Sequence, residues 1–295
     1  MNDLKSDFCI EIDFKKSSSE RPSRVFKAMA GLIDSMQSLD VSLAQTIDAR
    51  IRPELILQDI EVGSIKSWLR NRILEIDDDA LKTLDIKKII GDYLVKAKYR
   101  ILERLKTKDS LNASEIKALQ VQLQKLAEET GVRKIPSYGV VRYRELAEFW
   151  IRTSESTAVL GESDVAKYIS GSGQIILPKG TFLDDEAKEQ ILTQEISTEE
   201  TTLLLKVKKP DYLGQSRWLF HHDKHPIEAN IDDKEWLAAF QNREIIIRPG
   251  DSLKARLKTE VRKGYDKEDI SVHYCITKIF DVIPGDTGTQ ASLFS

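Results

Sequence analysis

All four imidazole side chains and one of the two thiols lie in the last third of the chain, where they could bind a metal ion. Three histidines surround an aspartate, and a fourth precedes a cysteine by two residues: His221, His222, Asp223, His225, His273 and Cys275. Zinc requires about four such ligands at a fixed spacing. Because successive residues of a strand point to opposite faces, His221 and His222 cannot both bind one ion from a regular strand. We therefore place His221, His222 and His225 around a turn and predict no metal and no other cofactor.

Carboxylates beside a lysine form a second candidate site, because metal-dependent nucleases hold magnesium with carboxylates and stabilise developing charge with a lysine. The stretch contains Asp184, Asp185, Glu186 and Lys188. Such a catalytic core belongs on an apolar strand, whereas this stretch is charged and predicted to be helical, which favours a solvent-exposed connector. The sequence also lacks the common phosphate-loop, zinc-protease, serine-hydrolase and Cys-x-x-Cys motifs. These observations favour a protein that is not an enzyme.

Basic side chains are concentrated between residues 82 and 108, where nine lysines and arginines stand against three acidic residues. Lys96, Arg100 and Arg104 recur every four residues, so a helix would present them as one stripe that can follow a phosphate backbone. Lys88 lies two turns before Lys96 and extends this stripe. A solvent-exposed helix face has the same pattern, and nothing in it indicates base-specific recognition. The stripe is the candidate contact with the nucleic acid backbone.

The composition is that of an ordinary globular protein. The 295 residues are 41% hydrophobic and 32% charged, which suits two domains with substantial cores. The net charge is only -3, so any contact with DNA must be local. The two cysteines have no metal or redox spacing, and neither a secretion signal nor a membrane span is found. We expect a bacterial cytoplasmic protein without membrane contact.

The first part of the chain is predicted to be a helix-rich α+β domain, residues 1–165. Strands are expected at 8–14 and 54–60, and helices at 22–43, 79–105, 112–130 and 143–160. The segment 65–73 fits either a strand or a helix. Leu119, Leu123 and Leu126 form an apolar stripe that could be buried or could pair with another chain, which leaves a homo- or hetero-oligomer open.

From residue 174 to 284 the periodicity becomes alternating, which predicts a small β-barrel or sandwich. Strands are expected at 203–207, 217–220, 227–231, 244–247, 253–257 and 270–282, with one helix at 234–240. Glycines at 161, 171 and 173 mark the expected domain boundary. Residues 285–295 are predicted to be a flexible tail, because turn formers and small polar residues dominate from Pro284 to Thr289.

That tail carries the sequence Gln290-Ala291-Ser292-Leu293-Phe294. Two large apolar side chains at the end of a polar segment are unfavourably solvated unless something covers them. The pattern resembles the peptide by which bacterial polymerases and repair proteins bind the ring-shaped sliding clamp of DNA replication. The resemblance covers five residues. It implies that Gln290 forms a hydrogen bond at the pocket edge, Leu293 and Phe294 fill an apolar pocket, and Ser292 helps to fix the turn.

The resemblance leads to the expectation of a non-enzymatic interaction protein that docks on a bacterial or phage sliding clamp and acts at replicating or repaired DNA. A tail that folds back onto the protein's own surface is the other interpretation of Leu293 and Phe294. The alternative function is a component or effector enzyme of a phage-defence or mobile-element system, with an active site assembled from scattered residues. The chain as a whole resembles uncharacterised proteins of such systems only vaguely.

Overall fold

The structure is a computed structural model that describes residues 7–14, 21–61, 64–74, 84–105, 113–132, 139–212, 216–223, 225–248 and 250–285. These residues form six helices and ten strands, and the predicted α+β class is confirmed. The chain divides into two compact units, residues 1–192 and 193–295. We describe each unit by itself.

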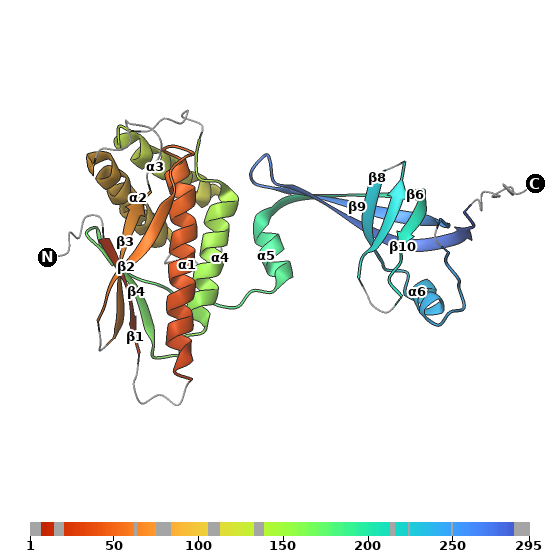
Figure 1. Cartoon of the computed structure of the whole chain (residues 1–295), viewed down its shortest axis with the longest axis horizontal. Helices are drawn as coiled ribbons and strands as arrows, with labels where there is room; N and C mark the ends of the chain where they lie inside the picture. The colour runs from red at the N-terminus through yellow and green to blue at the C-terminus, as the bar shows by residue number, and fades with distance from the viewer. Residues whose placement is uncertain are drawn as a thin grey trace, which may run out of the picture. The chain divides into compact units, whose positions relative to one another are not determined.

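The first unit is built on a five-stranded antiparallel sheet with the order β2-β3-β1-β4-β5 (Figure 1). The strands are β1 (Asp7–Asp13), β2 (Pro53–Glu61), β3 (Ile65–Ile73), β4 (Val165–Ser170) and β5 (Gly173–Ile176). The segment that fitted either a strand or a helix is therefore the strand β3. Its alternation of buried and half-buried residues is that of a strand next to the sheet centre.

β1 lies at the centre of the sheet and is buried on both faces, although its alternating sequence is typical of a half-buried strand. On the face that contacts the helices, the Phe8 ring stacks on Tyr168 with 5.3 Å between ring centroids. On the opposite face, the Asp7 carboxylate accepts two hydrogen bonds from Arg70, at 2.6 and 2.8 Å. Polar residues of β1 are thus buried because cations on the neighbouring strands cover them.

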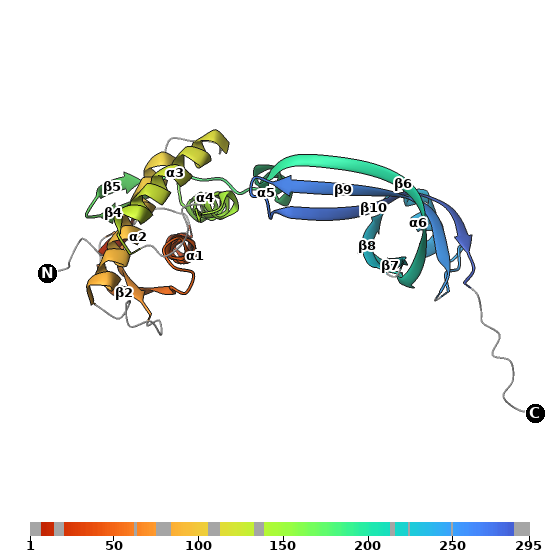
Figure 2. The ribbon, with the colours of Figure 1, turned by 90° about the horizontal axis from the view of Figure 1, so that it is seen from above.

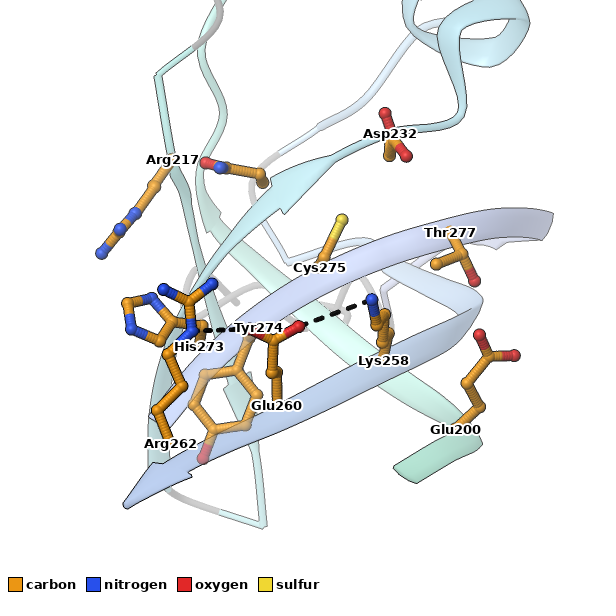
Figure 3. A pocket seen from close by; sticks show the side chains of 11 residues that line it. Glu200, Arg217, Asp232, Lys258, Glu260, Arg262, His273, Tyr274, Cys275 and Thr277 are labelled. Atoms are coloured by element: carbon orange, nitrogen blue, oxygen red, sulfur yellow. Dashed lines mark hydrogen bonds and ion pairs between the residues drawn. The ribbon is translucent and has the colours of Figure 1, made fainter. Parts of the chain in front are cut away.

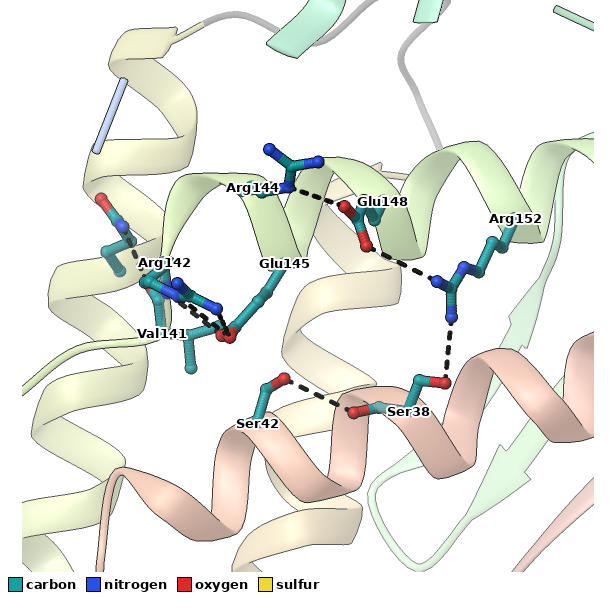
Figure 4. Close-up of polar contacts among 9 residues, drawn as sticks. Ser38, Ser42, Val141, Arg142, Arg144, Glu145, Glu148 and Arg152 are labelled. Carbon is teal, nitrogen blue, oxygen red and sulfur yellow. Dashed lines mark hydrogen bonds and ion pairs between the residues drawn. The ribbon is translucent and has the colours of Figure 1, made fainter. Parts of the chain in front are cut away.

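Four helices pack on this sheet and on one another: α1 (Ser23–Gln45), α2 (Leu84–Leu105), α3 (Ala113–Glu129) and α4 (Tyr143–Ala158). α1 and α2 contact the strands, α4 packs along α1, and α3 contacts α2 and α4 (Figure 2). At the surface, Arg152 of α4 donates to Ser38 of α1 at 3.0 Å, and Glu148 pairs with Arg144 and Arg152 (Figure 4). Exposed pairs of this kind contribute roughly 0–1 kcal/mol each, so apolar packing must hold the helices.

In α1, Phe26, Met29, Ile33 and Met36 recur at helical spacing, which predicts one buried apolar stripe that the structure confirms only in part. Met29 and Met36 are buried as expected, but Phe26 is 65% exposed and Ile33 is only half-buried. The rest of the buried stripe consists of Val25, Leu32, Leu39 and Leu43. Apolar residues lie on both sides of this stripe, so helical spacing alone fits two overlapping faces and the tertiary contacts decide between them.

The leucine stripe of α3 packs inside the first unit. Leu119 and Leu123 are each 1% exposed, and α3 contacts α2 and α4. These two side chains are therefore not free to pair with another chain, as the sequence alone allowed. The predicted start of this helix at Asn112 lies outside the described residues. Gly131 follows the helix with a φ of 67°, the left-handed conformation that glycine commonly adopts after a helix.

The division between the units lies later than the glycines predict. β4 and β5 complete the first sheet, because β4 pairs with β1 and forms a hairpin with β5. The glycine-rich segment is the turn of that hairpin, where Gly173 has a φ of 130°. The first unit ends with α5 (Asp185–Leu192), and the second begins at Thr193. A glycine cluster marks a turn, but it does not distinguish a hairpin from a linker.

Gly180 lies directly against the backbone of α4, and we expect Gly180→Ala to lower the free energy of unfolding by about 1–3 kcal/mol. The Gly180 N–H donates to Thr157 Oγ1 at 3.0 Å, and an added Cβ would lie 1.9 Å from the Ser154 carbonyl oxygen. Urea denaturation measures the effect, with the exposed Lys179→Ala as the control. If both variants unfold at the same urea concentration as the unchanged protein, this backbone contact does not exist.

The second unit is a closed barrel with the order β10-β8-β7-β6-β9, which confirms the predicted barrel (Figure 1). Its elements are β6 (Thr193–Lys209), β7 (Trp218–His222), β8 (His225–Ile231), α6 (Lys234–Gln241), β9 (Ser252–Gly264) and β10 (Ile270–Ile283). All neighbouring strands are antiparallel except β8 and β10, which are parallel. β6, β9 and β10 continue beyond the barrel as a long three-stranded ribbon (Figure 2).

The path of the chain through the barrel defines its fold class. Three strands form a meander, α6 follows, and the last two strands form a hairpin that pairs with the first strand through β9 and with the third through β10. A five-stranded Greek-key barrel of this kind is the architecture of the OB-fold. The architecture by itself does not determine the function.

An aromatic cluster closes the barrel core. Trp218 and Phe240 pack edge to face with centroids 4.8 Å apart, and Phe220 stacks on Trp218. The predicted helix at 234–240 is confirmed, but the predicted strand at 244–247 is wrong. These residues follow a chain reversal at Arg243, whose φ is 65°, and they pair with no strand among the described residues. Three consecutive isoleucines have a high strand propensity, which the tertiary structure overrides.

Candidate functional site

The predicted basic stripe lies on an exposed face of α2. Lys88, Lys96, Arg100 and Arg104 are all exposed, and Arg100 pairs with Glu103 at 3.0 Å. The helix between residues 84 and 105 is confirmed, so the residues four apart do lie along one side of it. Phosphate binding by this stripe stays a prediction.

Lys98, which the sequence analysis counted among these basic residues, is in the core instead. Its side chain is fully buried and forms an ion pair with the fully buried Asp40 of α1. With the side-chain amide of Asn71 in β3 turned so that both of its polar atoms find partners, its nitrogen donates to Asp40 Oδ2 at 2.8 Å and its oxygen accepts from Lys98 Nζ at 3.2 Å. The ammonium also lies 4.3 Å from the centre of the Phe8 ring. This cluster joins two helices to the sheet and cannot reach a ligand.

Burial dominates the protonation of the cluster. It raises the pKa of the Asp40 carboxyl to about 6, although the neighbouring Lys98 ammonium lowers it. Burial also lowers the pKa of Lys98, while Asp40 raises it. Taking two charges out of water costs free energy that their attraction repays only with good geometry and further hydrogen bonds. Asn71 supplies such hydrogen bonds here.

The clustered histidines lie in the hairpin between β7 and β8, at the turn that the sequence predicts. His222 pairs with His225 across the turn, where Asp223 has a φ of 45°. The His222 Nδ1 atom lies 3.3 Å from the Leu204 carbonyl oxygen. In the part of the chain that the structure describes, no group of three histidine, cysteine or carboxylate side chains is placed to hold a metal ion.

A groove of about 400 Å³ on the second unit was not predicted from the sequence. It lies between the ends of β7 and β8 and the ribbon formed by β9 and β10 (Figure 3). One row of side chains crosses it from strand to strand: Asn230, Cys275, Lys258 and Glu200 are successive partners in the barrel. Arg217, which precedes β7, also lines the groove (Figure 3).

Charges in this groove balance one another. Three cations and three carboxylates line it: Arg217, Lys258, Arg262, Glu200, Asp232 and Glu260. Glu260 accepts a 2.6 Å hydrogen bond from Arg262 Nε and lies 3.5 Å from Lys258 Nζ (Figure 3). Burial raises the pKa of the Cys275 thiol, which makes it a weak nucleophile at neutral pH. The signal available in the sequence was the set of charged residues at every second position of β9, Lys258, Glu260 and Arg262.

The stretch around Glu186 is helical and exposed, as predicted for a connector. α5 contains no buried residue, and Lys188 Nζ pairs with Glu155 at 2.7 Å. Lys188 is therefore bound to a carboxylate of α4 and does not stand beside an apolar catalytic strand.

The peptide with Gln290, Ser292, Leu293 and Phe294 lies outside the described residues, which end at Gly285. The chain is held to the barrel just before it. The Gly285 N–H donates to Asp251 Oδ1 at 2.9 Å, and the Arg248 N–H donates to Oδ2 of the same carboxylate at 2.7 Å. These hydrogen bonds lower the pKa of Asp251.

No family model matches this chain, and neither a curated protein nor a solved structure is significantly similar to it. Within the described ranges, none of the helices combines the length and the apolar character needed to cross a membrane.

Proposed function

We propose that this protein is a non-enzymatic adapter that docks on a bacterial or phage sliding clamp and acts at replicating or repaired DNA. The observation that carries the proposal is the peptide Gln290-Ala291-Ser292-Leu293-Phe294. Burying Leu293 and Phe294 in an apolar pocket is worth roughly 1.5–3 kcal/mol for each side chain. A micromolar complex requires about 8 kcal/mol, so these two side chains would supply a large part of the affinity.

The position of the peptide in the chain supports this role. β10 ends at Ile283, and seven residues lead from there to Gln290. A fully extended chain of that length spans at most about 25 Å. A ligand on the barrel would thus be held close to a clamp bound at the peptide. Five-stranded barrels of this architecture bind oligonucleotides in other proteins, which makes DNA a suitable ligand.

The direct test is calorimetry of a peptide of residues 288–295 with a purified bacterial sliding clamp. We expect micromolar binding that disappears in a peptide with Leu293→Ala and Phe294→Ala. A peptide that shows no heat of binding at millimolar concentration would refute clamp docking.

The α2 stripe gives a second expected result. Lys96→Glu together with Arg104→Glu should weaken binding of the full chain to duplex DNA and make it less dependent on salt. Each lost phosphate contact reduces the slope of log K against log salt by about 0.9. Fluorescence anisotropy at several salt concentrations measures this slope. The matched control, Lys117→Glu with Lys125→Glu on the exposed side of α3, should bind as the unchanged protein does. Equal slopes for both pairs would exclude the stripe as a phosphate contact.

An effector enzyme of a phage-defence or mobile-element system is the alternative proposal. The groove on the second unit favours an enzyme, because carboxylates, His273 and the Cys275 thiol all line this space of about 400 Å³. A nuclease assay with magnesium or manganese tests it. DNA cleavage that is lost with Glu260→Gln would establish an active site in the groove, and inactivity of the unchanged protein would argue against it.

A further inference from the structure

The outer surface of β6, β9 and β10 carries an exposed sheet face outside the groove. Its members are Thr202, Leu204, Lys206, Lys254, Arg256, Lys278, Phe280 and Asp281, which we call the β6–β9–β10 face. Arg256 is the partner of Thr202 on one side and of Lys278 on the other. Lys254 is the partner of Leu204 and of Asp281 in the same way. Alternate residues of β9, such as Ala255, are buried, so these side chains point away from the barrel core.

Two large apolar side chains are exposed on this face. Leu204 is 52% exposed and Phe280 is 48% exposed. The pairing of β9 with β10 is irregular between Ile279 and Asp281, so Phe280 has no partner in the ladder. The Arg256 guanidinium lies over the Phe280 ring, 5.5 Å from its centre. The irregularity therefore presents an aromatic ring to solvent with a cation beside it.

The charge of this face is positive. It carries four cations, Lys206, Lys254, Arg256 and Lys278, against the single carboxylate of Asp281. One of the four cations is partly neutralised, because Lys278 Nζ lies 3.3 Å from the carboxylate of Asp233, which caps the N-terminus of α6. The other three remain to attract an anion. The whole chain has a net charge of -3, so this concentration of positive charge is local.

The outer face of β7 and β8 differs in this respect. Along these two strands, every second side chain points into the barrel core, and the others form the outer face. The residues of this outer face are Leu219, His221, Pro226, Glu228 and Asn230. None of these is a lysine or arginine, and Glu228 is exposed. Barrels of this architecture commonly bind ligands on the equivalent of this face. In this chain a polyanion would meet a carboxylate there, whereas the β6–β9–β10 face offers cations and an aromatic ring.

We propose that the β6–β9–β10 face binds single-stranded nucleic acid, with phosphates at Lys206, Lys254 and Arg256 and a base stacked on Phe280. Cations along a sheet track a phosphate backbone, and an exposed aromatic ring provides a stacking surface for any base. A duplex keeps its base faces covered by its own neighbours and cannot use Phe280. This inference rests on the proposed function in one respect only, which is that the bound nucleic acid would lie near the sliding clamp.

The test is fluorescence anisotropy of the full chain with labelled single-stranded DNA and, in a separate arm, single-stranded RNA of the same sequence. We expect Lys254→Glu with Arg256→Glu to weaken binding at least tenfold and to reduce the salt slope by about 1.4, since each single-strand phosphate contact contributes about 0.7. Phe280→Ala should weaken binding about tenfold with little change in slope, because it removes stacking and no charge.

Matched controls come from the same unit. Lys234→Glu with Lys267→Glu makes the same charge change at exposed positions outside the face, and Ile246→Ala removes a side chain that is 71% exposed. Each should bind the strand as the unchanged protein does. A thermal melt shows whether each variant is folded, and Arg256→Lys, which keeps the charge, should lose less than threefold.

Three results would overturn the inference. They are no binding of either single strand, equal losses in face and control variants, and tighter binding of duplex DNA that Phe280→Ala leaves unchanged. A preference for RNA over DNA would keep the face as the site and would identify its ligand. Because the assay contains no clamp, its failure leaves clamp docking standing, and failure of clamp docking leaves this result unaffected.

Discussion

Lys98→Met should lower the free energy of unfolding of the first unit by about 3–5 kcal/mol, because it leaves the Asp40 carboxylate buried without its cation. Both side chains are fully buried, and they join α1 to α2. A loss of this size is a large fraction of the roughly 5–15 kcal/mol that stabilises a typical domain, so the unfolded fraction of this unit should rise measurably at 37 °C. Urea denaturation followed by circular dichroism measures the loss. A change below 1 kcal/mol would mean that the pair is not buried as described.

The matched variant removes the whole polar cluster. Asp40→Leu, Asn71→Val and Lys98→Met together leave no buried polar group of the cluster unsatisfied. Replacing a buried ion pair by apolar residues of similar volume is often neutral or stabilising by about 1–4 kcal/mol. We therefore expect this triple variant to be at least as stable as the unchanged protein. If it is as unstable as Lys98→Met alone, loss of packing rather than an unpaired charge explains the single variant.

The difference in stability between the triple variant and the unchanged protein should depend on pH. Asp40 has an ordinary pKa of 3.8, and burial raises it to about 6 in the folded protein. Between these values the folded state binds more protons than the unfolded state does. The contribution of Asp40 to stability is thus fully present below about pH 4 and is lost as the pH rises through 6. The advantage of the triple variant over the unchanged protein should therefore grow between pH 4 and pH 6.

Leu293→Ala with Phe294→Ala should abolish binding of the full chain to a sliding clamp, with a loss of at least 100-fold. Truncating two apolar side chains that fill a pocket removes several kcal/mol, and each 1.4 kcal/mol is a factor of ten. Surface plasmon resonance with immobilised clamp measures the loss. A peptide that serves only for docking is not needed for folding, so the melting temperature should not change.

Ala291→Ser is the control for this experiment. The clamp-binding peptides that the tail resembles accept many residues at this position, so binding should change less than threefold. If both variants bind the clamp as the unchanged protein does, the peptide is not the docking element, and the tail must have another role.

The sequence predicted most helices and strands correctly, but it predicted less well which of them pair and which side chains they bury. Alternation in the second half of the chain predicted the barrel, because each strand has one face in the core and one in solvent. This interpretation failed at 244–247, where three isoleucines have strand propensity but pair with no strand in the described ranges. The glycines near 171–173 predicted a domain boundary, but they form the turn of the β4–β5 hairpin. Local patterns predict that the chain turns, but not which strands then pair.

The candidate sites show the same limit. Spacing of four residues predicted the exposed face with Lys96, Arg100 and Arg104. It could not show that Lys98, two residues after Lys96, faces the core, because its partner Asp40 is distant in sequence. The β6–β9–β10 face was missed for a similar reason. Arg256 and Phe280 are brought together only by the pairing of β9 with β10 and its irregular register.

Together, the two proposals mean that one chain binds a sliding clamp and a nucleic acid strand at the same time. Analytical ultracentrifugation of a labelled single-stranded oligonucleotide with the protein and a bacterial sliding clamp tests it most directly. We expect a complex of all three components that sediments faster than the protein–oligonucleotide complex. With Leu293→Ala and Phe294→Ala, only the protein–oligonucleotide complex should form. An oligonucleotide that sediments identically with and without the clamp would contradict it.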